Sequence, residues 1–64
     1  MITNLTQEEE MLLESLINIK YRLGSGLYRL RKESYKDVWD SLLSLASKME
    51  IMEKSSPKFI VIRL

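Results

Sequence analysis

The chain has 64 residues, with ten Lys and Arg against nine Asp and Glu, and it contains neither Cys nor His. Such a length allows one domain, residues 1–64, that hides only about 60% of its unfolded surface, so we expect oligomerisation to add stability. The lack of Cys and His excludes disulfides and removes the commonest metal ligands and the commonest general base. The net charge of +1 predicts no overall attraction to polyanions.

The first predicted helix spans about residues 6–32. Thr6 is expected to cap it, with Glu9 completing a capping box, and acidic residues follow in the first turn, where they suit the helix dipole. A helical apolar series then crosses the glycine-containing segment 24–26 without losing its phase: Leu12, Leu16, Ile19, Leu23, Leu27 and Leu30. The sequence therefore favours one continuous helix, and a break at Gly24–Gly26 stays open.

A second helix is predicted over about residues 35–53, with Ser34 as its cap. Its apolar positions have the same spacing: Val38, Leu42, Leu45, Met49 and Met52. A short turn makes two helices antiparallel neighbours, so we expect a mainly α fold, an antiparallel helical hairpin. The hairpin leaves apolar side chains over, which predicts a homodimer in the form of a four-helix bundle.

The last segment, about residues 58–64, reads KFIVIRL and is predicted to be a short β-strand. A strand that is apolar on both faces needs neighbours in a sheet. Three neighbours stay open: residues 1–5, the same strand of a second copy, or the sheet edge of another protein.

The surplus apolar residues indicate a surface for a protein partner. They make the chain, as a first hypothesis, a non-enzymatic interaction module, a phage or bacterial inhibitor of a larger host protein. The residues predicted to contact the partner are Tyr28, Trp39, Leu43, Phe59, Ile60, Val61 and Ile62.

An alternative function is nucleic-acid binding by a small dimer. Tyrosines recur every seven residues and each is followed by a basic residue, which suits stacking and phosphate contacts. The basic residues predicted for this role, around the tip of the hairpin, are Arg22, Arg29, Arg31, Lys32 and Lys36. The favoured interpretation of the same pattern is structural. The tyrosines lie at the edge of the core, and the basic side chains near the end of the helix interact favourably with the helix dipole.

Catalysis has little support in the sequence. The pairs Asp37 with Asp40 and Glu50 with Glu53 have helical spacing, but no His and no glycine-rich phosphate loop accompany them. We expect no enzyme, no cofactor and no metal. No apolar run approaches the roughly 18 residues of a membrane span, so we expect a cytoplasmic protein.

Two segments resemble a known class of regulators. TQEEEMLLESLINIKY (6–21) and SYKDVWDSLL (34–43) are similar to antirepressors of the AbbA type and to small helical regulators of bacteria and phages. The resemblance implies a dimer that binds and blocks a larger regulator. The near-neutral charge and the KFIVIRL tail depart from that class, so only the general role of a helical inhibitor is implied.

Overall fold

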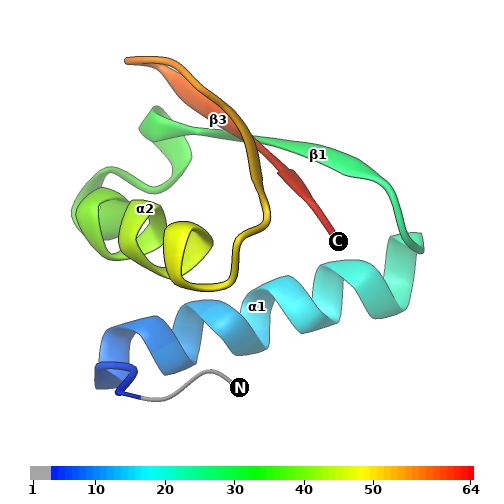
Figure 1. The fold of residues 1–64 in the computed structure, drawn as a ribbon, viewed down its shortest axis with the longest axis horizontal. Helices are drawn as coiled ribbons and strands as arrows, with labels where there is room; N and C mark the ends of the chain where they lie inside the picture. Colours follow the sequence, from blue (N-terminus) through cyan, green and yellow to red (C-terminus); the bar gives the residue numbers. More distant parts are fainter. Residues whose placement is uncertain (1–3) are drawn as a thin grey trace.

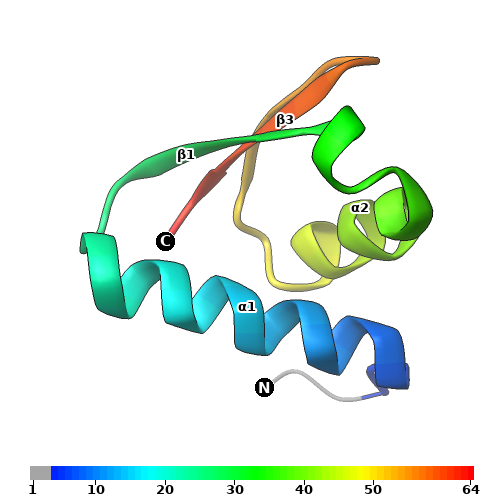
Figure 2. The same cartoon turned by 180° about the vertical axis from the view of Figure 1, so that it is seen from behind.

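The computed structural model describes residues 4–64, which form two helices packed on one face of a three-stranded antiparallel sheet (Figure 1). The central strand of the sheet, β3, lies between β1 and β2. The view from behind shows the sheet again on one side of both helices (Figure 2). The elements in chain order are α1 (Gln7–Leu23), β1 (Leu27–Arg31), the 3₁₀ turns η1 (Lys32–Ser34) and η2 (Lys36–Val38), α2 (Trp39–Lys48), β2 (Met52–Ser55) and β3 (Phe59–Arg63).

The predicted mainly α hairpin is wrong, and the first reason lies at Gly24. This residue has φ 88° and ψ 179°, a conformation that is open almost only to glycine, so α1 ends at Leu23. The chain then continues as an extended strand. The apolar series keeps its helical phase by coincidence, since Leu23 and Leu27 are exposed whereas Leu30 reaches the core from β1.

The second helix is shorter at both ends than the predicted span 35–53. Ser34 belongs to η1, and α2 begins at Trp39 with no side-chain cap. At the other end, Glu50 adopts φ 55°, and the backbone N–H of Ile51 donates to the carbonyl of Ala46 at 3.1 Å. This left-handed helix end usually carries glycine. Because Glu50 stands there instead, the sequence shows no stop signal.

The C-terminal strand exists, but as the centre of a sheet rather than as a lone strand. β3 pairs with β1 from Leu27↔Arg63 to Arg31↔Phe59, and with β2 across an irregularity between Met52 and Lys54. Its strand partners therefore belong to its own chain. Ile60 and Ile62 on its inner face are buried in the core, whereas Phe59 and Val61 on its outer face are half-buried. The predicted pairing with residues 1–5 falls partly on residues 1–3, which lie outside the described residues.

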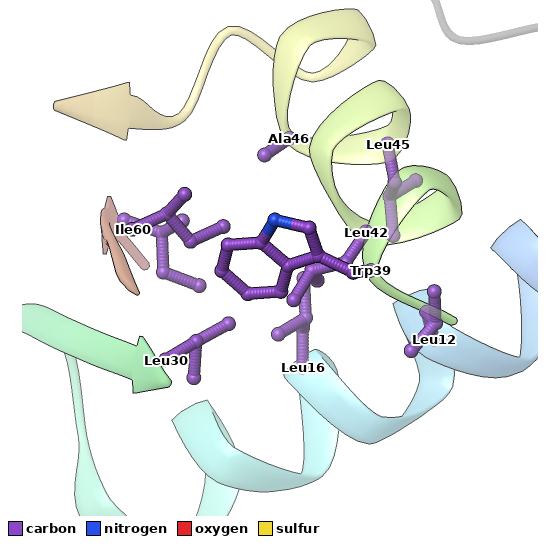
Figure 3. Packing of buried hydrophobic residues seen from close by; sticks show 9 residues of the cluster. Leu12, Leu16, Leu30, Trp39, Leu42, Leu45, Ala46 and Ile60 are labelled. Carbon is purple, nitrogen blue, oxygen red and sulfur yellow. The ribbon is translucent and has the colours of Figure 1, made fainter. Parts of the chain in front are cut away.

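The core fills the space between the helices and the inner face of the sheet. The indole of Trp39 lies at its centre, between Leu16 of α1 and Ile60 of β3 (Figure 3). Every helix and the two strands β1 and β3 contribute to the cluster of buried residues: Leu12, Leu16, Leu30, Trp39, Leu42, Leu45, Ala46, Ile60 and Ile62. The opposite face of the sheet is not covered by either helix.

One charged side chain is buried at the contact between α1 and α2. Glu9 is only 2% exposed, and its Oε1 accepts hydrogen bonds from the Thr6 backbone N–H at 2.8 Å and from Lys48 Nζ at 2.7 Å. The Thr6 hydroxyl accepts from the Glu9 N–H in return, so the predicted capping box is confirmed. The hydrogen bond from Lys48, and after it the one from the Thr6 backbone, lowers the pKa of Glu9 from its ordinary value of 4.5 to about 2.

We expect acid to weaken the fold through Glu9. A carboxylate with a lowered pKa contributes its full stability above the ordinary value of 4.5 and loses that contribution as the pH falls towards about 2. Thermal unfolding between pH 7 and pH 2, followed by circular dichroism, measures the effect. Glu9→Gln should lower the melting temperature at neutral pH and flatten its dependence on pH in the acid range. Glu10→Gln, an exposed neighbour, is the control; an unchanged profile in Glu9→Gln would contradict the prediction.

Candidate functional site

The candidate site lies at one end of the sheet, where β1 runs into η1 beside the start of β3. Arg29 and Arg31 are two residues apart on β1, so both project from the outer face of the sheet. The register places Arg31 opposite Phe59, and the Lys32 backbone N–H donates to the Lys58 carbonyl at 2.8 Å. Backbone pairing therefore brings the basic residues of two distant segments together.

These residues line an open groove of about 650 Å³. Five of the residues that line it are cations and one is a carboxylate, so the groove has a strongly positive potential. The two ion pairs among residues 4–64, Lys48 with Glu9 and Arg63 with Glu53, do not involve its cations. The lining consists of Arg29, Arg31, Lys32, Glu33, Lys36, Pro57, Lys58 and Phe59.

Phe59 is the aromatic side chain of the groove. The guanidinium carbon of Arg29 lies 4.8 Å from the centre of its ring, and Lys54 Nζ of β2 lies 5.7 Å from it. Cations at these distances are attracted by the ring, which holds them on the outer face of the sheet. The half-buried ring thus stands between a cation from β1 and a cation from β2.

The charge of the site differs sharply from that of the whole chain. At the other end of the outer sheet face, the charge of Arg63 is compensated by Glu53 at 2.7 Å. Acidic residues gather instead in the first turn of α1, at Glu8, Glu9 and Glu10. The net charge of +1 therefore averages regions of opposite charge, and it hides the positive groove.

The structure brings together most of the basic residues that the sequence indicated for nucleic acid. Arg29, Arg31, Lys32 and Lys36 all line the groove. Arg22 does not, since it lines a separate hollow with Tyr21 and Tyr35 among others. The predicted hairpin tip does not exist; the four groove residues meet because β1, η1 and η2 follow one another around the end of the sheet.

The residues predicted for a protein partner are divided between the core and the surface. Trp39, Ile60 and Ile62 are buried and are not accessible in this fold. Tyr28 and Leu43 are half-buried and pack against the core. Phe59 and Val61 lie on the outer face of the sheet, also half-buried. The seven residues therefore do not form one surface.

Two cations of the site, Lys54 and Lys58, were missed by the sequence prediction. They flank the Ser55-Ser56-Pro57 segment, which was interpreted only as the end of a helix. The sequence signal that could have found them is the same segment taken as a hairpin turn, since Ser and Pro favour turns as well as helix ends. A β2–β3 hairpin places Lys58 next to the end of β1, and it places Lys54 on the other side of the central strand β3.

A second hollow, of about 420 Å³, adjoins the groove and shares Lys32 and Lys36 with it. It carries three carboxylates, those of Glu8, Asp37 and Asp40, and Glu8 accepts a hydrogen bond from the Ser41 hydroxyl. Within residues 4–64, no group of three or more acidic side chains is arranged to hold a metal ion. The two hollows attract opposite charges.

Comparison of the chain with protein-family models, with curated proteins and with solved structures gives no match. The resemblance of residues 6–21 and 34–43 to AbbA-type regulators therefore stays a prediction. In the described part of the chain, neither helix has the length and apolar character needed to cross a membrane. What the protein does has to be argued from its site.

Proposed function

We propose that the protein binds single-stranded nucleic acid in the groove at the end of its sheet. The observation that carries the proposal is a groove lined by five cations and one aromatic ring, with a single carboxylate among them. Phosphates of the strand bind along Arg31, Lys32, Lys36 and Lys58. A base packs on the guanidinium of Arg29, which lies over the Phe59 ring.

Phosphate contacts supply most of the affinity in this arrangement. Each cation that neutralises a phosphate releases a condensed counterion, which makes binding strongly dependent on salt. The arginines offer planar donors that match phosphate oxygens, and the lysines act as mobile point charges. None of these contacts reads a base, so we expect little dependence on sequence.

The aromatic ring favours a single strand over a duplex. A base can pack on Phe59 or on the guanidinium beside it only if its face is free, which requires an unstacked base. Stacking of one base on an aromatic side chain contributes about 1–3 kcal/mol. A duplex can contact the same cations but cannot use the ring, so we expect it to bind more weakly.

A salt titration tests the proposal directly. Fluorescence anisotropy with a labelled oligothymidylate should show binding whose slope of log K against log salt is about −3, as expected for four phosphate contacts to a single strand. A duplex of equal length should bind less tightly. Polyglutamate, which has charges but no bases, is the control. Equal affinity for polyglutamate, or no binding at low salt, would overturn the proposal.

We propose that the protein is located in the cytoplasm, in line with the absence of Cys. Single-stranded nucleic acid is present there. Inhibition of a larger host protein stays a prediction from the sequence. The residues named for it are split between the core and the outer sheet face. The residues that line the groove, by contrast, lie together at one end of the sheet.

A further inference from the structure

β1 is an edge strand of the sheet, and its hydrogen bonds show which of its backbone groups face β3. Gly26 and Leu64 exchange N–H···O=C bonds at 3.0 and 2.9 Å, and the Lys32 N–H donates to the Lys58 carbonyl at 2.8 Å. Bonded residues alternate along an antiparallel pair, so residues 26, 28, 30 and 32 point their backbone groups at β3. The backbone groups of residues 27, 29 and 31 therefore point away from the sheet.

These outward groups form a regular template for another strand. They are the N–H groups of Leu27, Arg29 and Arg31 and the carbonyls of Leu27 and Arg29, since the Arg31 carbonyl belongs to the first turn of η1. Within residues 4–64, none of them bonds to another backbone group. The opposite edge, β2, is interrupted by an irregularity between Met52 and Lys54, which makes it a poor template. An added strand is therefore expected at β1.

The side chains along this edge indicate what kind of strand fits it. Arg29 and Arg31 project from the outer face, and neither takes part in the two ion pairs found among residues 4–64. An antiparallel strand beside β1 places one side chain directly next to each arginine on the same face. Carboxylates match the planar donors of a guanidinium, so charge complementarity favours an acidic side chain at every second residue.

The inward side chains of such a strand meet a surface with a single charge, that of Arg22. Figures 1 and 2 both show β1 running above the C-terminal half of α1. A hollow of about 620 Å³ lies between this half of α1 and Tyr35, and the half-buried Ile19 belongs to its lining. With carboxylates outward and apolar side chains inward, the fitting segment alternates acidic and apolar residues.

A second copy fits this edge poorly. Full antiparallel overlap of two β1 strands places Arg29 of one copy beside Arg29 of the other, and like charges directly opposite are destabilising. The four-helix bundle predicted from the sequence does not apply either, because it needs a helical hairpin, whereas the chain forms two helices and a sheet. The occupant that the charges favour is a different chain.

We propose that β1 binds an extended segment of another protein in which acidic and apolar residues alternate. The segment pairs antiparallel with β1, as β3 does, and becomes the fourth strand of the sheet. Its carboxylates lie beside Arg29 and Arg31, and its apolar side chains face α1. The contact uses the backbone edge, so it is independent of nucleic-acid binding, although the same two arginines also line the groove.

Peptide binding measured by fluorescence anisotropy tests this contact. The probe is a short labelled peptide that alternates valine and glutamate. Glutamates next to the arginines point their own N–H groups at β1, so N-methylation of the glutamates should weaken binding at least about tenfold. N-methylation of the valines, whose N–H groups point away, should leave the affinity unchanged. Equal losses for the two methylated peptides, or no binding of the parent peptide at low salt, would overturn the proposal.

Polyglutamate separates this contact from attraction by charge alone. It has carboxylates but no apolar side chains to face α1, so it should bind at least about tenfold more weakly than the alternating peptide. Equal affinities would overturn the proposal.

Leu27→Pro tests the same edge from the side of the protein. Leu27 is 56% exposed, and proline is tolerated at the first position of an edge strand whose N–H faces outward. The variant loses one outward donor and should bind the peptide about tenfold more weakly, whereas Leu27→Ala should bind it as the wild type does. Oligonucleotide binding should be unchanged in both variants, because Leu27 does not line the groove. Equal affinity of the two variants for the peptide would contradict the contact.

Hydrogen exchange measured by nuclear magnetic resonance on the wild-type protein locates the bound peptide, even if Leu27→Pro fails to fold. The amide hydrogens of Leu27, Arg29 and Arg31 should exchange at least about tenfold more slowly with saturating peptide than without it. Tyr28 and Leu30 already bond to β3 and are the internal control. Unchanged exchange at the three outward amides while the peptide binds would overturn the proposal.

Discussion

Replacing Trp39 by alanine is expected to remove most of the protein's free energy of unfolding at 25 °C. Trp39 is only 7% exposed and contributes the largest side chain of the core. Removing a buried Trp or Phe side chain costs about 3–5 kcal/mol, because transfer energy is lost and a cavity remains. A domain of this size has a free energy of unfolding of roughly 3–10 kcal/mol, so the loss takes most of it. The sequence predicted Trp39 to lie on a partner-binding surface, and an exposed position predicts almost no loss in the free energy of unfolding.

Urea unfolding followed by far-ultraviolet circular dichroism measures this effect, since the variant lacks the tryptophan used for fluorescence. Trp39→Phe keeps a ring in the core and should remain folded with a lower midpoint. Met11→Ala removes an exposed apolar side chain and should change the free energy of unfolding by no more than about 0.5 kcal/mol. If Trp39→Ala unfolded at the same urea concentration as the wild type, the buried position of Trp39 would be contradicted.

Removing two groove cations, in Arg31→Ala with Lys58→Ala, is expected to weaken oligonucleotide binding by at least about a hundredfold at low salt. Each residue is proposed to hold one phosphate, and a hydrogen bond to a charged group contributes about 1.5–3 kcal/mol. The salt slope should become shallower by about 1.4, because two phosphate contacts to a single strand are lost. The two residues come from separate segments of the chain, β1 and the β2–β3 turn, and both line the groove.

The matched control is Arg22→Ala with Arg63→Ala, which changes the net charge by the same amount outside the groove. Arg22 lines another hollow, and the charge of Arg63 is already compensated by Glu53. We expect this control to bind almost as the wild type does, with the same salt slope. Equal losses in both double variants would mean that the overall charge, and not the groove, determines binding.

The start of α1 could be predicted from the sequence because its determinants are local. Thr6 and Glu9 are three residues apart, and the hydrogen bonds between them need only one turn of helix. The C-terminal strand was predicted for a related reason, since a run of β-branched and aromatic residues disfavours the helix. Neither pattern indicates what the element packs against.

The end of α1 and the strands β1 and β2 could not be predicted in this way. The helical spacing continues from Leu23 to Leu27 and therefore predicted a helix. In the structure Gly24 ends the helix, and the residues after it pair with β3 as a strand. Glu50 took a left-handed conformation that its residue type does not signal. Met52–Ser55 is polar for a strand, and its pairing with β3 outweighs its local preference.

The candidate site shows the same division. Its basic residues on β1, η1 and η2 were visible as a cluster along the chain, because they lie within eight positions of one another, from Arg29 to Lys36. Lys54, Lys58 and Phe59 join them only through the sheet order β1-β3-β2. The sequence by itself determined the start of α1 and the apolar C-terminal strand, since both depend on residues that are neighbours along the chain. The tertiary structure alone decided which side chains are buried and which meet in one groove, because burial and charge separation depend on segments distant along the chain.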